Sequence, residues 1–232
     1  MVSKTSLTAA VRTFDWKAVD AGLSAQPQLL SHRDERGRNW LHLCCATNLG
    51  NSAPKASLRT AEVLLDHGID LHDHAFAEGA WKATPVWFSI AHGRNLPLAR
   101  YLIGLGASPQ FSLYAAVWND DIAAIDFLVR AGADVEEGAG QGSTPFLGAI
   151  GWSFAPAWAL ARHGANVNAR DKAGMTAAHL MLKKAAPLAQ FKELARRGAR
   201  FDIPSAAGKT AADIMRRKKD PAFRNLAEDE RG

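Results

Sequence analysis

A short motif recurs five times along the chain, and it constrains the fold more than any other feature. Each copy is an apolar stretch that runs into a glycine: LLDHGIDL (64–71), LIGLGASP (102–109), LVRAGADV (128–135), LARHGANV (160–167) and LARRGARF (194–201). The glycines are spaced by 38, 26, 32 and 34 residues. Glycine readily takes the left-handed backbone conformation that often ends a helix, because it has no Cβ. The motif therefore predicts a helix that stops at each glycine.

A second pattern predicts where the other helix of each unit begins. A threonine precedes a short apolar run at Thr84-Pro85, Thr144-Pro145, Thr176-Ala177 and Thr210-Ala211. Threonine is a good helix N-cap, and proline is favoured at the first helical position. The unit is therefore expected to be turn, helix, helix and loop, which places the chain in the all-α class.

These residues together resemble the ankyrin repeat, a unit of about 33 residues whose first helix opens with Thr-Pro-Leu-His. The best copy is DKAGMTAAHLML at 171–182, which follows ANVNARD at 165–171. Residues 34–45, DERGRNWLHLCC, keep the aspartate, the glycine and Leu-His but replace Thr-Pro with Asn-Trp. The resemblance covers nearly the whole chain and implies a solenoid of about five stacked helix-turn-helix repeats with helical caps.

We expect a single ankyrin-repeat domain over residues 1–232. Its parts are a helical N-terminal cap at 1–33, about five repeats at 34–201, a capping half-repeat at 202–219 and a frayed tail at 220–232. The cap is read as two helices within residues 4–30, broken near Thr13 to Asp15 and closed by Pro27.

Irregular spacing predicts irregular repeats. We expect a longer loop at 72–78, an insertion at 48–57, a longer inter-helix turn at 95–97 and no hairpin turn before the helix at 110–116.

Charge and composition bear on the partner and the compartment. The formal net charge is +5, but residues 170–219 alone hold 13 Lys and Arg against 4 Asp and Glu, which favours an acidic partner. Cys44 and Cys45 are adjacent and unsuited to an ordinary disulfide, and no apolar run is long enough for a membrane span or a secretory signal. We expect a cytoplasmic monomer without membrane contact, with export into another cell as an effector left open.

Two motifs resemble catalytic or nucleotide sites only in part. Gly208-Lys209-Thr210 has Ile203 where a phosphate-binding loop needs glycine, and no strand is expected before it. Residues 140–143, GQGS, lack the spacing of a hydrolase elbow. We therefore predict no catalytic residue, no cofactor and no enzymatic activity.

Histidine appears in two settings. His67, His72 and His74 alternate with Asp66, Asp70 and Asp73, a set that suits a transition metal only if the loop folds back on itself, and a polar loop of this kind is usually solvated surface. No metal site is predicted. In the resemblance, His42 and His179 stand at the family's histidine position, which implies that they hydrogen-bond the turn.

The tryptophans provide the candidate binding site. The ankyrin resemblance places hairpin tips, and the residues just after the small-residue pair of each first helix, on a concave groove. The predicted partner-binding residues there are Trp81, Trp118, Trp152, Lys172, Lys183 and Lys184. Arg36, Arg38 and Met175 fall on the same surface. Trp118 and Trp152 occupy one site of successive repeats and are expected to be neighbours. The alternative is that these rings fill gaps beside Gly148, Ala149 and Gly151; Trp16, Trp40, Trp87 and Trp158 are assigned to the core.

Exposed tryptophan and arginine dominate the energetics of protein interfaces. We therefore predict a non-enzymatic module that binds a partner protein with an acidic portion on its groove, as adaptor, regulator or inhibitor. The alternative is nucleic-acid binding through the basic C-terminal third, with phosphate contacts from Arg216, Arg217, Lys218 and Lys219. The sequence does not choose between a regulator of an enzyme, a neutralising partner of a toxin and an exported effector.

Overall fold

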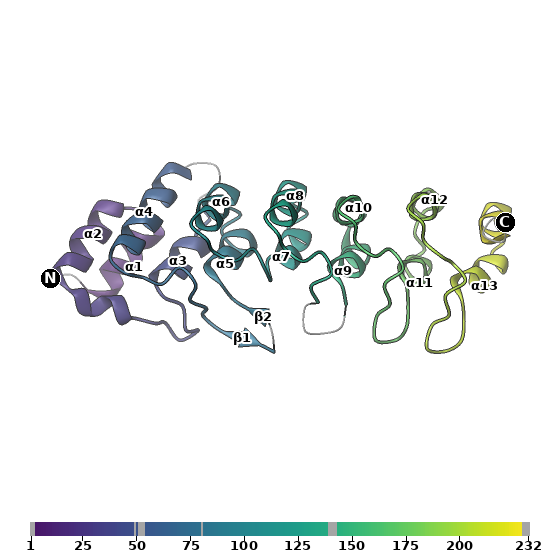
Figure 1. Cartoon of the computed structure of the whole chain (residues 1–232), viewed down its shortest axis with the longest axis horizontal. Coiled ribbons are helices and arrows are strands. Elements are labelled where there is room, and N and C mark those ends of the chain that lie inside the picture. The colour runs from purple at the N-terminus through teal and green to yellow at the C-terminus, as the bar shows by residue number, and fades with distance from the viewer. Residues whose placement is uncertain (1–2, 49, 51–53, 80, 139–142, 229–232) are drawn as a thin grey trace. The chain divides into compact units, whose positions relative to one another are not determined.

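The computed structural model describes residues 3–48, 50, 54–79, 81–138 and 143–228 (Figure 1). The chain divides into two compact units, of which the first holds residues 1–119 and 130–133 and the second holds 120–129 and 134–232. The single domain expected from the sequence stays a prediction.

The first unit is built from paired helices and one small hairpin. Its elements are α1 (Lys4–Arg12), α2 (Trp16–Ala25), the 3-10 helix η1 (Pro27–Ser31), α3 (Trp40–Ala46), α4 (Pro54–Asp66), the strands β1 (Ala77–Glu78) and β2 (Trp81–Lys82), α5 (Pro85–Ala91), α6 (Leu96–Gly104) and α7 (Leu113–Trp118). The strands are antiparallel, with Ala77 opposite Lys82 and Glu78 opposite Trp81.

The described residues of the second unit form helices joined by loops, with no strand. The helices are α8 (Ile122–Arg130, whose last residue falls in the first unit), α9 (Pro145–Trp152), α10 (Phe154–Arg162), α11 (Ala177–Lys183), α12 (Leu188–Arg196), α13 (Ala211–Arg216) and α14 (Pro221–Glu228). We call the odd-numbered helices first helices and the even-numbered ones second helices. Within each unit, Figure 1 shows the first helices in one row and the second helices in another.

The predicted helix boundaries are confirmed. Thr84, Thr144, Thr176 and Thr210 are the N-caps of α5, α9, α11 and α13. The five motif glycines, Gly68, Gly106, Gly132, Gly164 and Gly198, all have φ between 82° and 101°. At the N-terminal end, α1 packs on α3 and α2 packs on α4, as the helices of successive repeats do.

The core lies between the two rows of helices. In the first unit it contains Leu41 of α3, Leu64 of α4 and Leu102 of α6, all fully buried; in the second, Phe146 of α9 and Phe191 of α12 are fully buried. Each such side chain contributes about 1.5–3 kcal/mol relative to exposure. This burial, rather than helix propensity, stabilises helices as short as α3.

The C-terminal end corrects two expectations. Residues 221–228, expected to fray, form α14, and the predicted half-repeat is a full helix pair. The reason is packing: the ring of Phe223 meets that of Phe191 edge-on at 5.2 Å between centroids, and Ala227, four residues on, is buried. Residues 229–232 lie outside the described residues.

The loops between helices follow the predictions in part. Asn95-Leu96-Pro97 does not lengthen a turn; the Asn95 side chain caps α6 by accepting from the Leu98 N–H at 3.1 Å, and Pro97 lies in the first turn. The loop at 72–78 leads into the β1–β2 hairpin, and Ser112 precedes α7 without a hairpin, both as expected. Of the insertion expected at 48–57, residues 54–57 instead form the first turn of α4, and residues 49 and 51–53 lie outside the described residues.

Candidate partner-binding surface

Two tryptophans end first helices and point into solvent. Trp118 is the last residue of α7 and is 67% exposed, and Trp152 is the last residue of α9 and is 65% exposed. Neither ring fills a gap in the core, so that alternative is wrong. Their adjacency depends on how the two units are placed and stays a prediction.

Local packing explains why Trp118 is presented. Four of the five residues before it in α7 are buried, namely Leu113, Ala115, Ala116 and Val117. The next residue, Asn119, fixes the helix end because its side-chain amide donates to the Ile90 carbonyl at 2.8 Å, which joins the ends of α7 and α5. A large ring is thus held at the surface by a helix end that is itself fixed.

Of the four tryptophans assigned to the core, one is fully buried and three are half-buried. Trp40 is fully buried, and its Nε1 donates to the Leu29 carbonyl at 2.7 Å, which confirms the assignment. Trp16, Trp87 and Trp158 are half-buried, which corrects it. Each has a polar or aromatic neighbour at the surface; for example, the Trp158 Nε1 donates to Gln190 at 2.9 Å.

Trp81 lies in a group of rings that sequence reasoning missed. We define the aromatic cluster as Phe76, Trp81, Trp87, Phe88 and His92. Trp81 and Trp87 meet edge-on at 5.1 Å between centroids, Phe76 lies 5.4 Å from Trp81, and His92 lies 5.3 Å from Trp87. One sequence feature points to this cluster: in Thr84-Pro85-Val86-Trp87, a tryptophan replaces the histidine of the repeat pattern.

The three lysines of the predicted site are exposed in the second unit. Lys172 precedes α11, Lys183 ends it and Lys184 is its C-cap, and among the described residues none of the three forms an ion pair. Arginines on second helices differ, because Arg197 binds Glu193 at 2.7 Å and Arg162 lies 3.8 Å from Asp126. A lysine at a helix C-terminus is favoured by the helix dipole, which gives Lys183 a structural role as well.

The two turn histidines have the predicted structural role. His179 is 3.0 Å from the Thr176 hydroxyl through Nδ1 and 3.0 Å from the Lys209 carbonyl through Nε2. His42 accepts from the Asn39 N–H at 3.2 Å through Nδ1. Its buried Nε2 is the one side-chain nitrogen or oxygen without a hydrogen bond among the buried groups of the described residues. Burial lowers the pKa of His42 to about 4.

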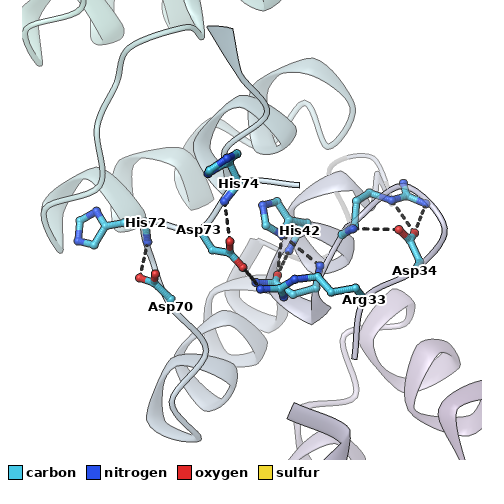
Figure 2. A network of polar contacts seen from close by, with 9 residues as sticks. Arg33, Asp34, His42, Asp70, His72, Asp73 and His74 are labelled. Carbon is cyan, nitrogen blue, oxygen red and sulfur yellow. Dashed lines mark hydrogen bonds and ion pairs between the residues drawn. The ribbon is translucent and has the colours of Figure 1, made fainter. Parts of the chain in front are cut away.

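The histidines and aspartates of the loop at 66–74 do not converge on a metal. Asp73 bonds Arg33 (Figure 2) and accepts from the Asn39 amide at 2.9 Å. His67 pairs instead with Asp20 at 2.8 Å. The rings of His72 and His74 do not point toward a shared centre in Figure 2. No three His, Cys, Asp or Glu residues are grouped to hold a metal ion within the described part of the chain.

The basic segment at the C-terminal end is partly occupied by internal contacts. Arg216 pairs with Asp213 at 3.0 Å, and the Lys218 ammonium lies 5.6 Å from the Phe223 ring. Arg217 and Lys219 are exposed. The tetrad therefore presents two exposed cations rather than four.

The remaining motifs have structural roles or lie outside the description. The Lys209 carbonyl accepts from Ser205, and Thr210 caps α13, so Gly208-Lys209-Thr210 is a repeat turn. Residues 140–142 of the GQGS motif lie outside the described residues. Burial raises the pKa of Cys44 to about 12, which keeps its thiol neutral.

No helix in the described part of the chain combines the length and the apolar character needed to cross a membrane.

Comparisons with known proteins give a consistent fold. No family model matches the chain, and no curated protein matches it. Among solved structures, the ankyrin repeat domain of Bcl-3, described as a unique member of the IkappaB protein family, aligns with a TM-score of 0.74 at 21% identity over 100% of both chains. The ankyrin repeat domain of human ASB11 aligns with a TM-score of 0.74 at 19% identity, over 95% of this chain and 96% of its own. The chain therefore has the ankyrin-repeat fold.

Proposed function

We propose that this protein is a non-enzymatic module that binds a partner protein on the face formed by its first helices and hairpin loops, the side that the ankyrin resemblance makes concave. The observation that carries the proposal is the exposure of Trp118 and Trp152 at the ends of two successive first helices. A tryptophan buries a large area on binding and loses little side-chain entropy, so exposed tryptophans are typical anchors of interfaces.

The charge of the second unit supports an acidic portion in the partner. Lys172, Lys183 and Lys184 carry positive charge that no acidic side chain among the described residues neutralises. Such charge steers an acidic surface and speeds its approach. The role as adaptor, regulator or inhibitor, and the cytoplasmic location, belong to this proposal.

Affinity capture from the source lysate tests the proposal. The unmutated chain is compared with Trp118→Ala/Trp152→Ala, and Leu105→Ala is the control, since Leu105 is 49% exposed but follows a second helix. We expect a protein retained by the unmutated chain and the control but lost from the double variant. Retention of the same proteins by all three chains would contradict the site.

The charge contribution is tested in the same way. Lys183→Glu/Lys184→Glu should weaken capture and flatten its salt dependence, whereas Lys192→Glu, an exposed position on α12, should change it less. Retention that depends on nucleic acid in the lysate, and that is lost on nuclease treatment, would support the nucleic-acid alternative instead.

A further inference from the structure

The aromatic cluster offers a second contact point in the first unit, separate from Trp118. Phe76 is 42% exposed on the approach to β1, and Trp81 and Trp87 are half-buried beside it. Their rings meet one another directly at 5.1–6.4 Å between centroids. The cluster is therefore a surface for an apolar side chain to cover rather than a cage that encloses one.

The turn at residues 34–38 packs against the residue that precedes this cluster. A Cβ built on Gly37 would stand 2.3 Å from the carbonyl oxygen of Ala75, the residue before Phe76. This close approach brings the backbone that carries Arg36 and Arg38 next to the start of the cluster.

The two arginines differ in their partners. Arg38 is neutralised by Asp34, whose carboxylate lies 2.7 Å from its guanidinium. Arg36 is exposed, and its side chain has no acidic partner among the described residues. Burial, followed by the charges of Arg38 and Arg36, lowers the pKa of His92, so both arginines lie near this ring of the cluster. Arg36 therefore supplies a positive charge beside the rings that no ion pair among the described residues occupies.

We propose that the aromatic cluster and Arg36 form a subsite for a partner segment in which a bulky apolar side chain stands next to a carboxylate. The inference rests on the proposed function, since it specifies part of the same partner. The rings supply apolar and edge-to-face contacts, which favour an aromatic or large aliphatic group. Arg36 offers a planar set of donors that matches a carboxylate.

Two small probes test this subsite in the full chain. 3-Phenylpropionate carries a ring and a carboxylate, and 3-phenylpropionamide has the same shape without charge. Both are titrated while the indole N–H signals of the seven tryptophans are followed by NMR. We expect both probes to shift Trp81 and Trp87, with the carboxylate binding about two- to fivefold tighter, as for an exposed charge pair.

Three variants decide the outcome. Arg36→Ala should remove the preference for the carboxylate, Phe76→Ala should weaken both probes, and Arg12→Ala, which removes an exposed arginine from α1, should leave both unchanged. Equal binding of the two probes to the unmutated chain, or no shift of Trp81 and Trp87, would overturn the proposal.

The subsite and the proposed function can fail separately. If the probes do not bind but capture of a protein still depends on Trp118 and Trp152, the subsite is wrong and the binding function stands. If the probes bind as expected but capture is indifferent to all first-helix variants, the binding function is wrong.

Discussion

The turns that precede α3 and α11 share the same internal hydrogen bonds but differ in their contact with the next turn. In each, an aspartate carboxylate accepts from two backbone N–H groups, Asp34 from Arg36 and Arg38, and Asp171 from Ala173 and Met175. In each, a histidine at the third helical position binds the N-cap residue.

The difference lies in the contact with the next turn. His179 reaches the Lys209 carbonyl at 3.0 Å, whereas the buried Nε2 of His42 makes no hydrogen bond. Among the described residues, a β hairpin intervenes before the next helix in the first unit alone, where it is formed by β1 and β2. A repeat motif thus fixes the shape of its own turn, while the neighbouring repeat decides whether the last hydrogen bond forms.

The largest effect is expected from the glycines that let each turn pack on its neighbour. A Cβ would stand 2.3 Å from a backbone oxygen at Gly37 and 2.7 Å from the Ala206 nitrogen at Gly174, and both residues have positive φ. Gly37→Ala and Gly174→Ala should each lower the free energy of unfolding by about 2–4 kcal/mol, from strain and overpacking together. Urea denaturation measures this.

Gly208 provides the control for that prediction. It has φ 73° but nothing within 4 Å of its added Cβ. Gly208→Ala should therefore cost about 1–2 kcal/mol, the backbone penalty alone. If Gly37→Ala costs no more than Gly208→Ala, the close packing of successive turns does not hold.

The next effect is a pH dependence specific to the first turn. His42 has a folded pKa of about 4 against 6.5, so the unfolded chain binds the proton first, and stability falls as pH drops from about 6.5 to 4. Near pH 4, the free energy of unfolding lost in this way approaches about 3 kcal/mol. His42→Asn removes this group, so urea denaturation across that range should show a shallower decline for the variant. An equal decline in the free energy of unfolding for the unmutated chain and His42→Asn would contradict the buried, neutral state of His42.

A third comparison isolates the hydrogen bond that only one histidine makes. Asparagine keeps a polar atom near the Nδ1 position and deletes the rest of the ring in both turns. At pH 7.5, His179→Asn should therefore cost about 1 kcal/mol more than His42→Asn, because it also loses the bond to Lys209. Equal costs would mean that this inter-repeat bond contributes nothing to stability.

The smallest effect comes from the ends of the same two helices. The chain leaves α3 through Thr47 in extended conformation but leaves α11 through Ala185 at φ 53°. Ala185→Gly relieves that strain but also raises the conformational entropy of the unfolded chain. We therefore expect the free energy of unfolding to rise by only about 0.5 kcal/mol. Ala189→Gly, at an exposed position inside α12, should lower stability instead. A loss at both positions would contradict the strain at Ala185.

Local chemistry explains which features the sequence could predict. Thr84, Thr176 and Gly198 act through their own backbone conformation and the nearest N–H groups. The spacing of these residues was therefore enough to predict where the helices begin and end. Helix α14 was not predicted, because it depends on Phe223 meeting Phe191, a contact between residues 32 positions apart.

The candidate site was predictable to a smaller extent. The placement of Trp118 and Trp152 at one site of successive first helices followed from the repeat register, but their exposure depended on which neighbours fill the core. The cluster around Trp81 brings together a loop residue, a strand residue and a helix, and no single pattern in the sequence links Phe76 to Trp87.

The most direct test of the binding function is a calorimetric titration of the captured partner into the unmutated chain, Trp118→Ala, Trp152→Ala and the double variant, with Leu105→Ala as the control. Thermal unfolding of the same proteins should coincide within the small effect expected of surface changes, about 0.5 kcal/mol. We expect each tryptophan variant to weaken binding by about 2 kcal/mol, roughly thirtyfold, as interface anchors do. Affinities equal to that of the unmutated chain would contradict the assignment of this face as the binding surface.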